Sequence, residues 1–155
     1  MKEAEALNSV SKFHQTFNHP ILSKPQIPPA NRADLRLNLL KEELKELEEA
    51  VENQDVVEAA DALCDLQYVL AGAILEFGMG EKFAELFAEV QRSNMSKVCK
   101  TEKEAQATIV HYQALDQDAY FEQKDGFFLV YRKTDNKTLK SINYSEVDLK
   151  SILEA

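Results

Sequence analysis

Hydrophobic residues recur every three or four positions along most of the chain, which is the spacing of amphipathic helices. Leu7, Val10 and Phe13 form the first such row. Together with start and stop signals, the pattern predicts five helices, at about Ala4–Phe17, Asn31–Glu52, Gln54–Phe77, Glu81–Lys97 and Glu102–Tyr112. A final helical turn is predicted at Ser151–Glu154.

Residues with restricted or unusual backbones divide the predicted helices. All four prolines fall within His19–Pro29, which predicts an extended linker. Asn31, with an acid three residues later, is predicted to cap the second helix. Gly78-Met79-Gly80 is expected to end the third helix, and Thr101 opens a capping-box spacing before the fifth.

The pattern changes after the fifth predicted helix. Two β-prone runs, Ala119–Gln123 and Phe127–Lys133, flank Lys124-Asp125-Gly126, which predicts a β-hairpin. A second turn is predicted at Thr134–Lys137. The fold class expected is therefore mainly α, a bundle of four to five helices with a small C-terminal β-hairpin.

Composition narrows the classes of function. The chain has 155 residues, 45% of them hydrophobic, so it suits one domain with a real core. Its formal net charge of -9 argues against a basic face for nucleic acid or anionic membranes, although a nucleotide substrate remains compatible when metal ions are present. Met1–Phe13 is polar and has no signal-peptide pattern, and no apolar run approaches a membrane span. We expect a cytoplasmic protein.

The two cysteines do not suggest chemistry. Neither Cys64 nor Cys99 has CxxC spacing or a neighbouring histidine, which argues against a thiolate zinc site. Cys64 lies in an apolar run, so it is predicted to be a buried core thiol.

The second helix carries acids on the edge of its apolar face. Its predicted core stripe is Leu40, Leu44, Leu47 and Val51, and a neighbouring row comprises Leu35, Leu39, Glu43, Glu46 and Ala50. At 100° per residue, Glu43 and Glu46 lie about 60° apart, with Glu42 about 40° from Glu46. The charged residues pointing away are expected to be solvated: Lys41, Lys45, Glu48, Glu49 and Glu52.

The third helix is nearly all apolar except for three acids. Glu58, Asp61 and Asp65 are spaced i, i+3 and i+7, which places them within about 60° of one another. An unpaired buried carboxylate costs several kcal/mol or shifts its pKa. These acids must therefore face a wet cleft or be neutralised.

Two helices with such rows can meet across a short connection, which would bring four or five acids together. Two carboxylates 4 Å apart repel by about 4 kcal/mol at an effective dielectric near 20. A divalent cation would relieve that repulsion, and ligands that are all oxygen favour Mg²⁺ or Mn²⁺ over Zn²⁺. The alternative is an acidic face paired with Lys and Arg from other helices.

The acidic residues of the second and third helices resemble the signature of a known superfamily. Glu42-Glu43-x-x-Glu46 followed by Glu58-x-x-Asp61 resembles the acidic signature of the all-α nucleoside triphosphate pyrophosphohydrolases, which include MazG proteins, dimeric dUTPases and phosphoribosyl-ATP pyrophosphatases. Further segments are similar to a MazG-like branch: Phe13-His14-x-x-Phe17, Leu35–Glu43, Ala60–Val69, Ser93–Lys97, Asp135–Lys140 and Asn143-Tyr144.

The resemblance implies roles for individual residues. The metal ligands it implies are Glu43, Glu46, Glu58 and Asp61. Glu42 would orient or deprotonate the attacking water, and Asp65 would support the ligands or be a further ligand. Asn94 and Lys97 match positions that contact nucleotide. Weaker candidates are His14, Arg36, Lys140 and Tyr144; His14 is favoured as a boundary residue beside core aromatics, and Arg36 as a salt-bridge partner.

The function expected is Mg²⁺-dependent hydrolysis of a nucleoside triphosphate to its monophosphate and pyrophosphate, with Mn²⁺ as a possible substitute. One alternative is an enzyme specific for dUTP or phosphoribosyl-ATP, and another is a non-catalytic helical interaction module. With four glycines in all, a P-loop is excluded. We expect a catalytic domain at residues 1–100, a C-terminal extension at 101–155 packed on it, and a homodimer or dimer of dimers without nucleic-acid or membrane partners.

Overall fold

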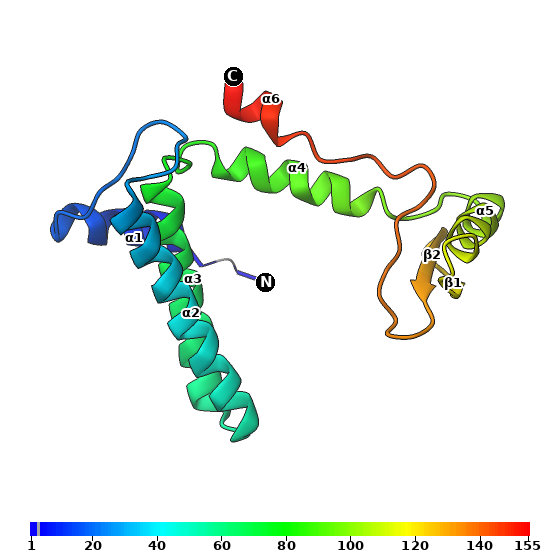
Figure 1. Ribbon diagram of the computed structural model, residues 1–155, viewed down its shortest axis with the longest axis horizontal. Coiled ribbons are helices and arrows are strands. Elements are labelled where there is room, and N and C mark those ends of the chain that lie inside the picture. Colours follow the sequence, from blue (N-terminus) through cyan, green and yellow to red (C-terminus); the bar gives the residue numbers. More distant parts are fainter. Residues whose placement is uncertain (3) are drawn as a thin grey trace. The chain divides into compact units, whose positions relative to one another are not determined.

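The computed structural model describes residues 1–2 and 4–155, and the fold is mainly helical with a small C-terminal sheet, as expected (Figure 1). The elements in the described residues are α1 (Ala6–Thr16), α2 (Ala30–Glu52), α3 (Val56–Glu76), α4 (Phe83–Met95), α5 (Glu102–Gln113), β1 (Ala119–Lys124), β2 (Phe127–Arg132) and α6 (Leu149–Glu154). No helix among these residues is both long and apolar enough to cross a membrane.

Contacts within the chain divide it into two compact units, residues 1–83 and 84–155. In the first unit, α2 and α3 form a long antiparallel hairpin, and α1 packs on α3 (Figure 1). Val10, Ala71 and Leu75 form a small buried cluster between α1 and α3. In the second unit, α5 packs on both strands. The predicted division into residues 1–100 and 101–155 stays a prediction.

A short turn joins α2 to α3, and α3 begins two residues later than the predicted Gln54. Asp55 caps α3 by accepting hydrogen bonds from the backbone N–H groups of Val57 (2.9 Å) and Glu58 (3.2 Å). Gln54 adopts a left-handed backbone with φ of 56°. This short connection brings the end of α2 directly alongside the start of α3.

The other end of the hairpin is closed by the proline-rich segment. The backbone N–H of Leu22 donates to the Leu75 carbonyl, and that of Gln26 donates to the Phe77 carbonyl, both at 3.0 Å. Gly78 ends α3 with φ of +70°, and a Cβ there would lie 1.9 Å from the Lys24 carbonyl oxygen. The linker can approach so closely only because this residue is glycine.

The predicted cap of α2 is wrong. The helix begins one residue earlier, at Ala30, with Pro29 in the capping position and no side-chain capping hydrogen bond. The fixed φ of proline suits a residue at the start of a helix. Asn31 therefore lies inside the first turn, where its side chain cannot cap.

The predicted core stripe of α2 is also wrong. Leu44 and Val51 are exposed, whereas the least exposed positions of α2 include Arg36, Leu40, Glu43, Leu47 and Ala50. These positions alternate by four and three residues, which is the spacing of a helix packed along one partner. The predicted and observed stripes share Leu40 and Leu47. The prediction chose Leu44 and Val51 for the remaining positions because the observed stripe contains two charged residues, Arg36 and Glu43.

Cys64 is exposed, so the prediction of a buried core thiol is wrong. Its neighbour in the sequence, Leu63, is also exposed. The apolar run misled the prediction because α3 has apolar residues on more than one face, and only one of these faces packs on α2.

The hairpin of the second unit matches its prediction. β1 and β2 pair antiparallel, with Lys124 opposite Phe127 across a two-residue turn. Asp125 and Gly126 have φ of 51° and 83°, as a tight type I′ hairpin turn requires. The sheet covers α5 through a core comprising Cys99, Ala105, Ile109, Ala119, Val130 and Leu139. The second predicted turn follows β2, at residues 133–135.

Candidate active site

An acidic groove lies at the turn end of the α2–α3 hairpin. It has a volume of about 380 Å³ and is lined by Glu46, Glu49, Ala50, Asn53, Asp55, Glu58, Asp61 and Ala62. Ala50 and Ala62 are buried, and such small side chains let the two helices approach closely. The groove thus unites three of the predicted metal ligands, Glu46, Glu58 and Asp61.

Glu43, the fourth predicted ligand, is half-buried at the same helix–helix interface. Burial raises the pKa of its carboxyl group, and the negative charges of Asp65, Glu46, Glu42 and Asp61 raise it further. Asp65 and Asp61 belong to α3, so this carboxyl group feels acids from both helices. The structure therefore brings the two predicted acidic rows to one face of the hairpin.

No ion pair neutralises these acids in the part of the chain that is described. Glu42, Glu43, Glu46, Glu58, Asp61 and Asp65 are all outside the ion pairs found there. Lys45 pairs with Glu49 at 3.0 Å, but both side chains are largely exposed. The acidic face is therefore not neutralised by ion pairs from other helices, and all of these acids except Glu43 are exposed to solvent.

The donor chemistry of the groove fits a hard divalent cation. Its polar lining consists of carboxylates and one amide, without a thiol or imidazole. Within residues 1–2 and 4–155, no three His, Cys, Asp or Glu side chains lie close enough together to hold an ion as they stand. Like charges repel, so side chains on facing helices spread apart unless a cation draws them together.

A buried ion network lies at the opposite end of the hairpin and consists of His14, Arg32, Arg36 and Glu76. Arg36 forms an ion pair with Glu76, which confirms the salt-bridge role predicted for it. His14 is only 1% exposed, so it lies deeper than the boundary position predicted. Neither side chain is free to contact a substrate in this arrangement.

Charge and burial set the pKa values in this network. Burial alone would raise the pKa of Glu76, but hydrogen bonds from Arg32 and Arg36 outweigh it, and the pKa is lowered. Burial lowers the pKa of His14, and the neighbouring Arg36 adds to this against the opposing hydrogen bond to Pro20. His14 is therefore held neutral and Glu76 ionised.

Sequence reasoning missed Glu76 and Arg32. Two signals pointed to them: Arg32 and Arg36 are spaced i, i+4, and Glu76 is a single acid at the end of a long apolar run. It also treated Glu49 as plainly solvated, although this side chain lines the acidic groove.

The remaining candidates belong to the second unit. Asn94 and Lys97 lie at the end of α4, where the Lys97 ammonium donates to the Asn94 side-chain oxygen at 2.8 Å. The Tyr144 hydroxyl is 2.7 Å from the Ser93 hydroxyl, and the Lys140 ammonium lies 4.2 Å from the centre of the Tyr144 ring. Lys140 and Tyr144 thus contact each other, while Asn94 and Lys97 form a separate pair.

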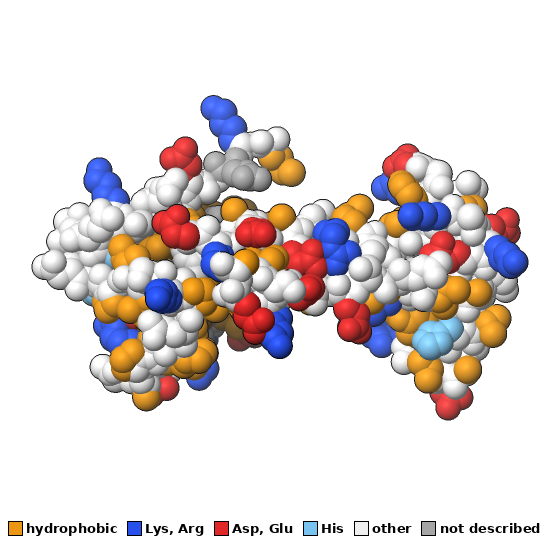
Figure 2. Space-filling model, turned by 90° about the horizontal axis from the view of Figure 1, so that it is seen from above, with side chains coloured by type: hydrophobic (Ala, Val, Ile, Leu, Met, Phe, Trp, Pro, Cys, Tyr) orange, Lys and Arg blue, Asp and Glu red, His pale blue; other side chains and the backbone are white. Residues whose placement is uncertain are grey.

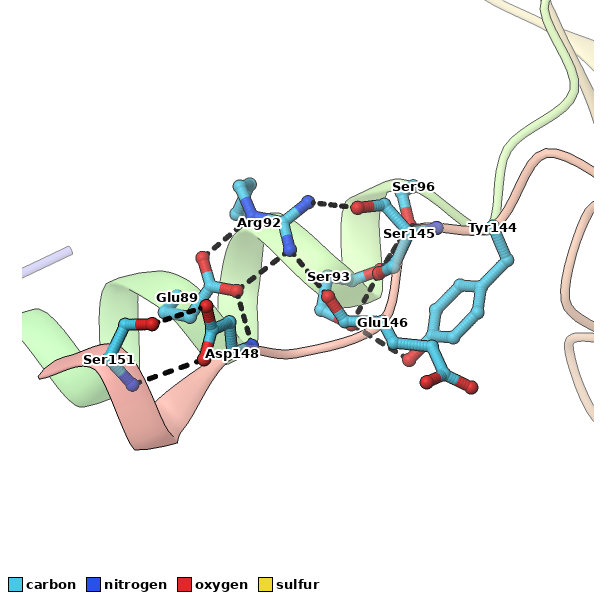
Figure 3. Close-up of polar contacts among 9 residues, drawn as sticks. All are labelled: Glu89, Arg92, Ser93, Ser96, Tyr144, Ser145, Glu146, Asp148 and Ser151. Atoms are coloured by element: carbon cyan, nitrogen blue, oxygen red, sulfur yellow. Dashed lines mark hydrogen bonds and ion pairs between the residues drawn. The ribbon is translucent and has the colours of Figure 1, made fainter. Parts of the chain in front are cut away.

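Side chains of α4, among them Glu89 and Arg92, hold the C-terminal tail on this helix (Figure 3). Arg92 donates to the Ser145 hydroxyl and the Glu146 carbonyl, both at 2.8 Å. The hydrogen bond from Arg92, together with one from the Asp148 backbone, lowers the pKa of Glu89 to about 2. The hydroxyls of Ser93 and Ser96 also donate to the Ser145 carbonyl, at 3.0 Å and 3.3 Å. Part of the segment at residues 93–97 that resembles the family therefore holds the tail.

Two facing helices with acids on one face match the arrangement that the resemblance to the MazG-like all-α superfamily implies. The chain belongs to the family described as phosphoribosyl-ATP pyrophosphohydrolase, whose family model matches residues 10–94. It is also 35% identical over 86 residues to an uncharacterised protein of Acanthamoeba polyphaga mimivirus. That alignment covers 53% of this chain and 32% of the relative, so the chain spans about a third of the relative's length.

Proposed function

We propose that the protein hydrolyses a nucleoside triphosphate to the monophosphate and pyrophosphate in a reaction that depends on Mg²⁺, with Mn²⁺ as a substitute. The observation that carries the proposal is the pair of acidic rows on α2 and α3, which lie on one face of the hairpin and outside the ion pairs of the described residues. Acids gathered on one face without ion-pair partners there indicate a function that needs them.

The residues that would hold the metal are Glu43, Glu46, Glu58 and Asp61. When bound, Mg²⁺ would offset the charge of the phosphates and polarise the phosphoryl group under attack. Asp65 approaches Glu43 across the helix interface and supports the ligand set from α3. Glu42 lies one residue from Glu43 and accepts the proton of the attacking water.

Asn94 and Lys97 are the candidates that the resemblance implies for nucleotide contact. Lys97 supplies a compact positive charge for phosphate oxygens, and Asn94 supplies an amide that can both donate and accept. Lys140 and Tyr144 contact each other, so we assign them a joint role in which the tyrosine ring orients the ammonium.

The family description favours one second candidate, phosphoribosyl-ATP, as a dedicated substrate. This molecule also carries a triphosphate, so the same acidic groove serves both reactions. The substrate, and not the chemistry at phosphorus, distinguishes the two candidates.

The test is product analysis with a panel of ribo- and deoxyribonucleoside triphosphates and phosphoribosyl-ATP. We expect pyrophosphate as the first product from at least one substrate with Mg²⁺ or Mn²⁺, and no turnover after EDTA treatment. Turnover confined to phosphoribosyl-ATP would select the second candidate. Orthophosphate as the first product across the panel, or turnover indifferent to EDTA, would contradict the proposal.

A further inference from the structure

The buried ion network joins α2 to α3 at the end of the hairpin away from the acidic groove. Glu76 is fully buried and Arg36 is 7% exposed. Taking ionised groups out of water carries a large penalty, and an apolar pair of the same size is often as stable. Stability alone therefore does not explain why charges occupy these positions.

The hydrogen bonds of the network link α2 to Glu76 on α3 and to His14 on α1. The Arg36 Nε donates to Glu76 Oε1 at 3.0 Å, and the Arg32 Nε donates to Glu76 Oε2 at 2.9 Å. One carboxylate on α3 thus binds two successive turns of α2. The Arg36 Nη2 also donates to His14 Nε2 at 3.1 Å, and the other ring nitrogen bonds the Pro20 carbonyl at 2.9 Å.

Gly72, one turn before Glu76, provides the space for the Arg36 guanidinium. A Cβ at Gly72 would lie 2.6 Å from Arg36 Nη1 and 3.2 Å from His14 Nε2. Glycine inside a helix costs about 1 kcal/mol relative to alanine, so its presence needs a reason. The reason here is that Arg36 lies against the backbone of α3 at this one position.

The row of least exposed positions on α2, which we call the inner stripe, continues from Arg36 to Glu43, two turns further along. Between and beyond them it consists of Leu40, Leu47 and Ala50, and such apolar layers can pack in more than one register. A slip of one turn moves a helix by about 5.4 Å along its axis. That movement would remove Glu43 from the neighbourhood of Asp61 and Asp65.

We propose that the buried ion network, seated at Gly72, fixes the axial register of α2 on α3 and so positions Glu43 against Asp61 and Asp65. Arg36 and Glu76 are then positioning residues for pyrophosphohydrolysis, although they contact neither the phosphates nor the water. A buried polar pair that specifies register between helices is a well-attested use of such groups. The catalytic consequence rests on the proposed function, whereas the register itself does not.

The register can be measured directly with spin labels. Cys64 is exposed on α3, Cys99 is buried, and Lys41 is exposed on α2, so Lys41→Cys provides a label pair across the hairpin. We compare the parent with the double variant Arg36→Met, Glu76→Met, with labelled chains diluted into unlabelled protein. The parent should give a narrow distance distribution, and the double variant one that is broadened or displaced by about 5 Å. Identical distributions would overturn the register proposal, whatever the activity.

The functional arm uses the same variant without labels. We expect helix content close to that of the parent, a Mg²⁺ concentration for half-maximal thermal stabilisation raised at least tenfold without nucleotide present, and a comparable loss in kcat. The matched control replaces an exposed ion pair, Lys150→Met with Glu154→Met, and should change neither quantity. A folded double variant with parental Mg²⁺ response and kcat would overturn the catalytic consequence.

Gly72→Ala keeps every charge and fills the space that the Arg36 guanidinium occupies. This variant tests the register proposal if the double variant fails to fold. We expect parental helix content, a shifted or broadened label distance and at least a threefold weaker Mg²⁺ response. An unchanged distance and response would overturn the proposal. A parent that releases no pyrophosphate from any substrate contradicts the proposed function instead, and the label distances still test the register.

Discussion

At the scale of single residues, the acids of the hairpin repel one another, and the proposed function requires them. Glu43 carries a raised pKa because it is partly buried among other carboxylates. Proteins keep such unfavourable arrangements where function requires them, and the surrounding packing tolerates the cost. Single substitutions should therefore separate stability from activity.

Asp61→Asn keeps the shape of the side chain and removes one negative charge from the acidic groove. We expect it to abolish turnover, because a ligand of the metal is lost. The metal-free variant should be as stable as the parent or more so, by up to about 1–2 kcal/mol, since one repulsive interaction is relieved. Thermal melts with EDTA and with Mg²⁺, beside an activity assay, measure both effects.

Mg²⁺ should raise the melting temperature of the parent more than that of Asp61→Asn, because the ion binds the folded parent more tightly. A fully active Asp61→Asn variant would end the assignment of this site.

His14 should make the protein sensitive to mild acid. Its folded pKa lies below the ordinary value of 6.5, so protons bind more readily to the unfolded chain. This contribution to stability is fully present above about pH 6.5 and is lost as the pH falls toward the folded pKa, by at most ~1.4 kcal/mol per pH unit. Glu76, whose pKa is also lowered, adds a second loss only below its ordinary value of 4.5.

Urea unfolding between pH 7.5 and pH 5 tests this with His14→Gln. The variant should be less stable at pH 7.5, because it loses packing, yet it should lose less stability on acidification than the parent. His111, which is exposed, provides the control, and His111→Gln should retain the full acid dependence. An equal acid dependence in His14→Gln and the parent would contradict the role assigned to this ring.

At the scale of elements, the two helices of the hairpin start in different ways. Asp55 caps α3 through its side chain, whereas α2 begins behind Pro29 and has no side-chain cap. The acidic groove lies beside the capped end, so the position of Glu58 in the first turn of α3 depends on Asp55.

Asp55→Ala should therefore lower the free energy of unfolding by about 1 kcal/mol, within the range of 0.5–2 kcal/mol known for caps. Asn31→Ala should change it by less than about 0.5 kcal/mol, because that side chain makes no cap. Denaturant unfolding of both variants at neutral pH measures the difference. Equal losses from the two substitutions would contradict the difference between the two helix starts.

At the scale of the whole molecule, the first unit has a second apolar seam that its own helices leave exposed. On α2 this seam comprises Leu37, Leu44 and Val51, and on α3 it comprises Val56, Leu63 and Leu70. Each set is spaced by seven residues, the repeat of helices that pack along a further partner. Figure 2 shows hydrophobic side chains at the surface of one face of the molecule.

We propose that a second copy of the chain covers this seam, giving a homodimer or a dimer of dimers. Leu44→Glu with Leu63→Glu should shift the mass toward the monomer, because charges would be buried at the interface. Light scattering at micromolar concentration measures it, with Leu115→Glu, an exposed leucine of the second unit, as the control. A monomeric parent would refute the assembly.

The sequence by itself determined what depends on local chemistry and periodicity. The spacing of apolar residues located the helices, Thr101 marked a helix start, and Asp125-Gly126 specified the hairpin turn. It also placed Glu58, Asp61 and Asp65 on one side of α3, because residues at i, i+3 and i+7 share a face of any helix.

Only the tertiary structure decided which face of each helix meets which partner. α2 and α3 carry apolar residues on two sides, and periodicity alone cannot rank two competing stripes. The inner stripe was chosen by pairings between distant residues: Arg36 with Glu76, the guanidinium with the space at Gly72, and Glu43 with Asp61 and Asp65. A charged residue counts against burial when considered alone, and it becomes compatible with burial only when its partner on another helix is known.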